Sequence, residues 1–177
     1  MKVRDLIVVI DFGGPQSQLI ARRVRSCQVY CEIWPYTTPL TELRARNVKG
    51  VILAGGPQSV GSEGAPQVDE ALFARDIPVM AVGYGAQLLT QALGGRLRPA
   101  EGREEGRAQA EILESTPLFE GLPIADNRLE VWLSGGDVVE APPTGFTVMA
   151  RSDDAPVAAM GHATKPLYGL LFRPEVS

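Results

Sequence analysis

Short apolar runs alternate with amphipathic segments through the first half of the chain. Residues 6–10 form a continuous apolar run typical of a buried parallel strand, and residues 17–25 follow with apolar positions at helical spacing and arginines between them. Strands that alternate with helices in this way indicate a parallel sheet with right-handed crossovers. The whole pattern predicts strands at 6–10, 30–34, 50–54 and 79–82 and helices at 17–25, 39–46, 66–74 and 86–93.

The second half has a different rhythm, in which short strand-like runs are separated by clusters of turn residues. We expect these runs to form hairpins that extend the sheet. Both halves are expected to share one core, because no internal repeat or linker-like tract separates them. Residues 101–107, rich in charge and glycine, are predicted to be an exposed loop. The predicted strands are 108–113, 129–133, 146–150, 156–160 and 167–172.

Composition narrows the class of protein. The chain has 177 residues, 45% of them hydrophobic, which suits one globular domain. Its formal net charge of -4 argues against a general nucleic-acid or membrane surface, and no apolar run approaches the ~18 residues of a membrane span. We therefore expect a cytoplasmic protein. Cys27 and Cys31 complete neither a disulfide framework nor a metal site, so we expect structural thiols, buried or half-buried.

One apolar strand leads into a glycine turn that continues as a helix. Residues 79–82 are apolar, Gly83 follows, and the next ten positions carry a helical pattern. In α/β enzymes a turn of this kind holds a Ser or Cys nucleophile, with helix-terminal N–H groups aimed at a developing oxyanion. Here the residue at the apex of this elbow, Gly83, has no side chain. Glycine also accepts without strain a backbone conformation that costs another residue about 1–3 kcal/mol.

Seven short motifs occur in the order found in class I (triad) glutamine amidotransferases, and together they resemble the GMP synthase type of that family. The motifs are Asp11–Gly13, Gln18–Arg25, Gly55–Val60, Gly64–Pro66, Tyr84–Leu88, Pro156–Ala159 and Phe172–Val176. The resemblance implies a three-layer α/β fold with a mostly parallel central sheet flanked by helices, joined here by the antiparallel second half. It also implies a single amidotransferase-like domain over residues 1–177, without a synthetase domain and without the closing helix usual in the family.

The resemblance identifies the positions where catalysis would occur. In that family a Cys at the elbow attacks the side-chain amide of glutamine, a His takes the thiol proton, and a Glu orients the His. The matching positions here are Gly83, Arg173 and Glu175. Arginine, with a pKa above ~12, cannot act as a base near neutral pH, so only the orienting carboxylate remains. The implied substrate-binding set is Gly55, Gly56, Tyr84, Gln87, Ser134 and Gly135.

Three further departures from the family pattern lie where it binds glutamine or meets its synthetase partner: Pro15, Gly135 and Leu171. We expect Arg173 to fill the space left by the missing pair through an ion pair with Glu175, because the two residues would share one strand face. The alternative is that Arg173 offers its guanidinium to an anionic ligand.

No other residue supplies the missing nucleophile and base. His162, the only histidine, lies in a predicted hairpin turn and is assigned a surface role. Cys27 and Cys31 are far from the elbow in the predicted topology. Ser134 is near the expected pocket but has no candidate base, and nucleophilic catalysis needs the two within hydrogen-bond reach.

The leading hypothesis is a GMP synthase-type domain of purine biosynthesis that does not hydrolyse glutamine and acts as a binding or regulatory pseudoenzyme. The alternative is an active or conditionally active glutaminase subunit that supplies ammonia to an ATP-pyrophosphatase. A third is a pocket altered to bind another small molecule. The expected ligand is glutamine or another small molecule, and the expected partner is an ATP-pyrophosphatase (synthetase) subunit. No cofactor, metal, nucleic acid or membrane is expected.

Overall fold

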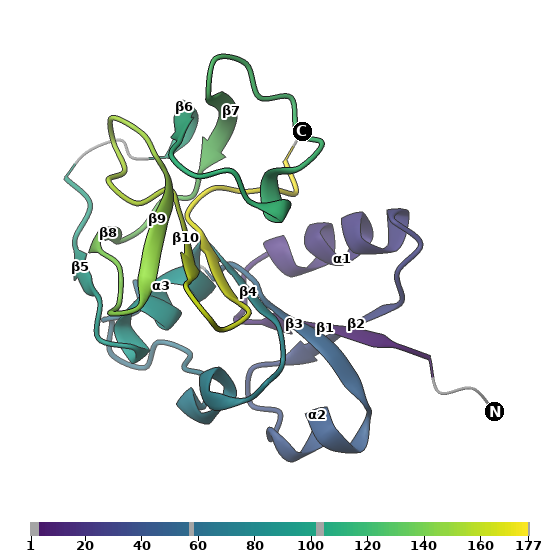
Figure 1. Cartoon of the computed structure of the whole chain (residues 1–177). Helices are drawn as coiled ribbons and strands as arrows, with labels where there is room; N and C mark the ends of the chain where they lie inside the picture. Colours follow the sequence, from purple (N-terminus) through teal and green to yellow (C-terminus); the bar gives the residue numbers. More distant parts are fainter. Residues whose placement is uncertain (1–3, 57–58, 102–104, 177) are drawn as a thin grey trace.

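The computed structural model describes residues 4–56, 59–101 and 105–176 (Figure 1). Its helices are α1 (Gln16–Ser26), α2 (Thr41–Ala45) and α3 (Tyr84–Ala92), with single 3-10 turns η1 (Glu70–Ala74) and η2 (Pro117–Phe119). Its strands are β1 (Leu6–Asp11), β2 (Cys31–Pro35), β3 (Val48–Leu53), β4 (Val79–Val82), β5 (Arg96–Arg98), β6 (Gly106–Ile112), β7 (Arg128–Leu133), β8 (Val138–Ala141), β9 (Phe146–Arg151), β10 (Ala159–His162) and β11 (Leu167–Leu170).

One sheet of nine strands carries the fold, in the order β2-β1-β3-β4-β11-β10-β9-β6-β7. The first five strands in this order are parallel to one another, and the remaining pairings are antiparallel. The predicted α/β sheet with an antiparallel extension is therefore confirmed. Because β1, β3 and β4 are adjacent and parallel, the loops after them lie at the same edge of the sheet.

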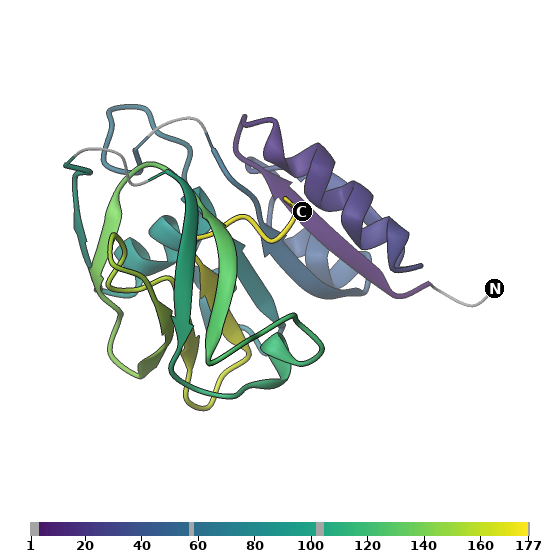
Figure 2. The same cartoon turned by 90° about the horizontal axis from the view of Figure 1, so that it is seen from above.

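The side chains of β1 alternate between two cores. Val8 joins Leu43 of α2 and Leu88 of α3 on one face, whereas Val9 packs with Ile20 of α1 on the other. Figures 1 and 2 show α1 and α2 on opposite faces of the sheet. Residues buried on both faces explain why the parallel strands read as continuous apolar runs.

The second half contributes to the shared core and also builds a cluster of its own. Val157 and Leu171 join the core beneath α2 and α3, as expected for halves with a common core. The antiparallel strands add a separate cluster that includes Phe119, Val131 and Met149. Figure 2 shows β6 and β7 beside the other antiparallel strands, away from α1 and α2.

Several predicted boundaries differ from the structure. The strand at 79–82 matches to the residue, but the helix expected at 66–74 is only the turn η1. Asp69 begins that turn by accepting the Ala71 N–H, and Pro78 favours extended backbone just before β4, so little chain remains for a longer helix. The predicted loop at 101–107 ends as the start of β6, and residues 102–104 lie outside the described part of the chain. Strands β5 and β8 were not predicted, because three or four residues show no readable periodicity.

The two cysteines differ in environment. The Cys31 side chain is buried in β2, with its thiol 3.5 Å from the Ala21 carbonyl oxygen, as predicted. The prediction is wrong for Cys27, which is exposed because it caps the C-terminus of α1 where the chain turns toward solvent. Among the described helices, none is long and apolar enough to span a membrane.

Candidate active site

The elbow lies between β4 and α3 and consists of Gly83. Its backbone has φ +55° and ψ -115°, a combination outside the regions open to residues with a Cβ. The Gly83 N–H donates to the Leu170 carbonyl at 2.8 Å, and the Gly83 carbonyl accepts the Gln87 N–H at 3.1 Å. A Cβ built at this position would lie 3.2 Å from the Ser134 Oγ. The turn is therefore held in the strained form of a nucleophile elbow, and a side chain placed on it would begin next to Ser134.

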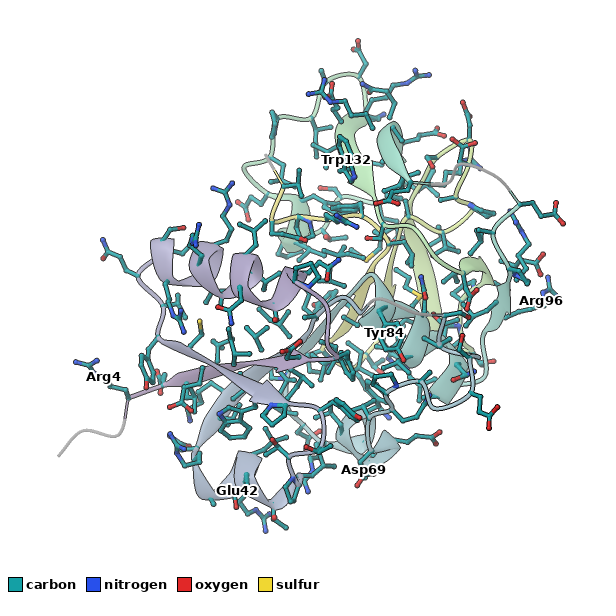
Figure 3. The ribbon with its side chains drawn as sticks, turned by 180° about the vertical axis from the view of Figure 1, so that it is seen from behind. Arg4, Glu42, Asp69, Tyr84, Arg96 and Trp132 are labelled. Carbon is teal, nitrogen blue, oxygen red and sulfur yellow. The ribbon has the colours of Figure 1, made fainter. Side chains whose placement is uncertain are left out.

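A cavity of about 290 Å³ opens beside the elbow. The structure brings all nine predicted site residues to its wall, although they come from separate stretches of the chain. Figure 3 labels Tyr84, which begins α3 at this point. The lining residues are Gln16, Gly55, Gly56, Ser59, Val82, Gly83, Tyr84, Gln87, Glu105, Ser134, Gly135, Gly136, Arg173 and Glu175.

Unpartnered polar atoms single out this cavity. In the described part of the chain, four buried side-chain atoms have no hydrogen-bond partner: Gln16 Oε1, Gln87 Oε1, Ser134 Oγ and Glu175 Oε2. All four belong to residues that line the cavity. A larger depression of about 570 Å³ near η2 has no such atom in its lining. Because buried polar groups are normally paired, four orphans at one place mark the smaller cavity as the ligand site.

Arg173 does not pair with Glu175, and that prediction is wrong. Its Nη2 donates to Glu105 Oε1 at 3.1 Å. Arg173 and Glu175 lie in a turn after β11 rather than on a strand, so their spacing of two does not place them on one face. The guanidinium and the Glu105 carboxylate are 28% and 56% exposed, which makes this an accessible ion pair at the cavity wall.

Glu105 is a site residue that sequence reasoning missed. It directly precedes β6, in the segment expected to be an exposed loop. A Cβ on Gly135 would lie 3.1 Å from Glu105 Oε2, so the Glu105 side chain covers that glycine. No local pattern marks such a residue, because its place depends on how the loop before β6 meets the end of β7.

Glu175 is almost fully buried, at 3% exposure. Burial raises the pKa of its carboxyl group, against a smaller lowering by its own backbone N–H and by the charge of Arg173. Its backbone carbonyl accepts a hydrogen bond from Arg23 Nε at 3.0 Å, which ties the C-terminal segment to α1. The carboxyl group therefore stands in a water-poor wall, with Oε2 unpartnered.

Tyr84 supports the site through its ring and uses its hydroxyl elsewhere. The hydroxyl donates to the Pro66 carbonyl at 2.6 Å, and burial raises the pKa of Tyr84. The ring leaves no room for a side chain on Gly56, where a Cβ would lie 2.9 Å from Cγ of Tyr84. It also contacts the ring of Phe12, with centroids 5.4 Å apart. Tyr84 thus joins α3 to the loop after β3.

Gln16 and Ser59 are two further lining residues that were not predicted. A Cβ on Gly55 would lie 3.1 Å from Cδ of Gln16, so that side chain lies across the glycine. The Ser59 hydroxyl donates to the Asp137 carboxylate, which links the loop after β3 to the loop after β7. The glycine turn just before α1 could have indicated Gln16, since this residue follows the end of β1 closely.

His162 lies away from the cavity, at the end of β10. Its Nδ1 accepts the backbone N–H groups of Thr164 and Lys165 at 3.1 and 3.0 Å. Its ring meets the edge of Phe146, with centroids 5.1 Å apart. These contacts explain the residue as part of a turn, as predicted.

Comparisons with known proteins agree with this architecture. Over 172 residues the chain is 45% identical to a glutamine-hydrolysing GMP synthase of Caldicellulosiruptor saccharolyticus, covering 97% of this chain and 33% of the relative. It is 47% identical over 171 residues to the GMP synthase of Carboxydothermus hydrogenoformans, covering 96% and 33%. The chain thus spans about one third of the length of the curated relatives it matches.

Solved structures show the same fold. One component of a GMP synthase, from Thermoplasma acidophilum, superposes with a TM-score of 0.84 at 27% identity, covering 100% of this chain and 87% of that one. A glutamine amidotransferase from Thermotoga maritima superposes with a TM-score of 0.80 at 21% identity, covering 98% and 77%. The class-I glutamine amidotransferase family model matches residues 8–177. Sequence, fold and site together show that the chain belongs to the class I glutamine amidotransferase family.

Proposed function

We propose that this GMP synthase-type amidotransferase domain binds a small ligand at the elbow cavity but does not hydrolyse glutamine, and that it acts as a binding or regulatory pseudoenzyme. The observation that carries the proposal is the elbow itself. Gly83 has the backbone geometry of a nucleophile position and no side chain with which to attack.

The general base is missing as well. Arg173 occupies the position that matches the family's histidine, and a guanidinium stays protonated at neutral pH. Its ion pair with Glu105 further disfavours loss of the proton. Acyl transfer through a covalent intermediate needs a nucleophile and a base within hydrogen-bond reach, and neither the elbow nor its neighbour at 173 supplies one.

The cysteines do not compensate. Cys31 lies in β2, which is separated from β4 by two strands of the sheet, and its side chain is buried against Ala21. Cys27 lies at the C-terminal end of α1. Neither residue lines the cavity. A ligand bound there is therefore out of reach of both thiols.

The binding function rests on what the cavity keeps. Gly55, Gly56 and Gln87, which the resemblance assigns to oxyanion stabilisation and glutamine contact, line the cavity beside the N-terminus of α3. We further propose that the domain works beside an ATP-pyrophosphatase subunit in purine biosynthesis. This is supported by the GMP synthase names of its relatives in sequence and in structure.

The deciding experiment measures ammonia released from glutamine by the purified chain, by itself and with an added GMP synthase-type ATP-pyrophosphatase. We expect release equal to a buffer blank in both arms. Turnover clearly above the blank in either arm overturns the proposal. Protein from a second, independent purification route is the control, because a contaminating glutaminase would differ in amount between the two preparations.

A conditionally active glutaminase is the second candidate, and Ser134 favours it. The Ser134 Oγ is buried, unpartnered and 3.2 Å from the Cβ position at the elbow. No described side chain makes a hydrogen bond with this hydroxyl, so its base is missing. A glutamine-like electrophile followed by intact mass and peptide mapping distinguishes the two. An adduct on Ser134, Cys27 or Cys31 would support the second candidate, and an unmodified mass supports the first.

A further inference from the structure

Two features at the cavity favour a negative charge. The Arg173 guanidinium has five N–H donors, of which one is used on Glu105. Helix α3, nine residues long, begins at Gly83 with no side-chain cap and no acidic residue in its first turn. A helix N-terminus carries a partial positive charge, here uncompensated by its own sequence.

Other groups at the same cavity favour a hydrogen-bond donor. Gln87 and Glu175 are 1% and 3% exposed, and each has a side-chain oxygen without a partner. Gln16 contributes a third such oxygen. Leaving buried acceptors unpaired is costly, whereas an ammonium group could donate to several of them at once.

Size limits the ligand further. The cavity of about 290 Å³ is at the lower end of small-molecule sites, which span ~300–1,000 Å³. A ligand that carries both an ammonium and a carboxylate within this volume is a free amino acid. The remaining question is whether its side chain ends in an amide or in a carboxylate.

We infer that the cavity takes an acidic amino acid of the glutamate class in preference to its neutral amide. This inference rests on the proposed function and names the ligand of the same site. The missing side chain at Gly83 leaves space at the N-terminus of α3, and Arg173 lines the same cavity. A carboxylate in that space makes charge-assisted hydrogen bonds that an amide cannot match, including a two-pronged pair with the guanidinium.

Glu105 is the group that such a ligand displaces. Its carboxylate is 56% exposed, so it can return to solvent when the ligand's carboxylate takes over Arg173. An exposed ion pair contributes little stability, and its loss is a small penalty. Burial also raises the pKa of Glu175, which favours its neutral form and reduces repulsion of an incoming anion.

Calorimetric titration of the 177-residue chain with L-glutamate and, separately, L-glutamine tests the inference. We expect glutamate to bind at least ~10-fold more tightly, the factor expected when one charge-assisted pair replaces a neutral one. Equal affinities, tighter glutamine binding, or no heat from either ligand up to a concentration on the order of 10 mM would each overturn it. Because glutamate binding is measured without turnover, its result is independent of the ammonia assay.

Variants separate the role of charge from general effects on folding. Arg173→Gln should abolish the preference for glutamate, and Arg173→Lys should keep part of it, because lysine keeps the charge without the planar fork. Glu105→Gln should tighten glutamate binding several-fold by freeing Arg173. Glu111→Gln is the matched control, since Glu111 pairs with Arg151 at 3.0 Å on the antiparallel strands.

The control should bind both amino acids like the parent, and thermal melts should show that each variant is folded. A Glu105→Gln variant that binds glutamate no better than Glu111→Gln would contradict displacement of Glu105. An Arg173→Gln variant that is folded and still prefers glutamate would contradict the inference as a whole.

Discussion

Replacing Gly83 with alanine tests whether the elbow is strained. Alanine adds a single Cβ to a backbone with φ +55° and ψ -115°. Two hydrogen bonds hold that backbone, one from the Gly83 N–H to Leu170 and one from the Gln87 N–H to the Gly83 carbonyl. Since the bonds oppose a change of φ and ψ, the added side chain must be accommodated in the disfavoured conformation.

The expected size of the effect comes from three contributions. Backbone strain at such a position costs ~1–3 kcal/mol, and the narrower unfolded ensemble of alanine returns about 0.4–1 kcal/mol. The new Cβ would lie 3.2 Å from the Ser134 Oγ, but that hydroxyl has no partner and can rotate without losing a hydrogen bond. We therefore expect a net loss of about 1–2 kcal/mol, which lowers the melting temperature by roughly 2–8 °C in a domain of this size.

Urea denaturation followed by circular dichroism measures this loss, with Gly94→Ala as the matched control. Gly94 also has a positive φ, +84°, but a Cβ there would meet nothing within 4 Å. It lies just after α3, where the left-handed region is a common helix ending. Gly83→Ala should be the more destabilised of the two. A Gly83→Ala variant as stable as the parent or as Gly94→Ala would refute the strained elbow.

Three further changes test the site. The double variant Gly83→Cys with Arg173→His should release ammonia from glutamine roughly 10²-fold faster than the parent, because it restores a nucleophile and a base; Gly83→Cys alone is the control, and no gain would show that the pocket is altered more deeply. Glu175→Gln should gain stability relative to the parent as pH rises above 4.5, the usual pKa of the group, because burial raises the folded-state pKa and the ionised carboxyl destabilises the fold; urea titrations should show this gain disappearing below that pH, and a pH-independent difference would contradict it. Tyr84→Phe should lose about 0.5–1.5 kcal/mol of stability with the hydrogen bond to Pro66, while calorimetry shows unchanged glutamate affinity; a large loss of affinity would instead place the hydroxyl in ligand binding.

Much of the fold could be predicted because its signals are local. The apolar run of β4 is bounded by Pro78 and Gly83, and both its ends were predicted to the residue. Strand β8 was missed because its partner β5 is contributed by a distant stretch of the chain, and neither has a pattern of its own. The helix expected at 66–74 shrank to one turn because its ends are set by a cap and by the approach to β4.

The site divides in the same way. The sequence by itself determined what chemistry is missing, because the absence of a side chain at Gly83 and the permanent charge at Arg173 are properties of residue type. Only the tertiary structure decided which carboxylate Arg173 meets. Glu105 lies 68 positions away, and Glu175, two positions away, is turned into a buried wall with an unpartnered oxygen. Short spacing in sequence fixes a shared direction only inside a regular strand or helix, and this segment is a turn, so the packing of distant loops set the electrostatics of the cavity.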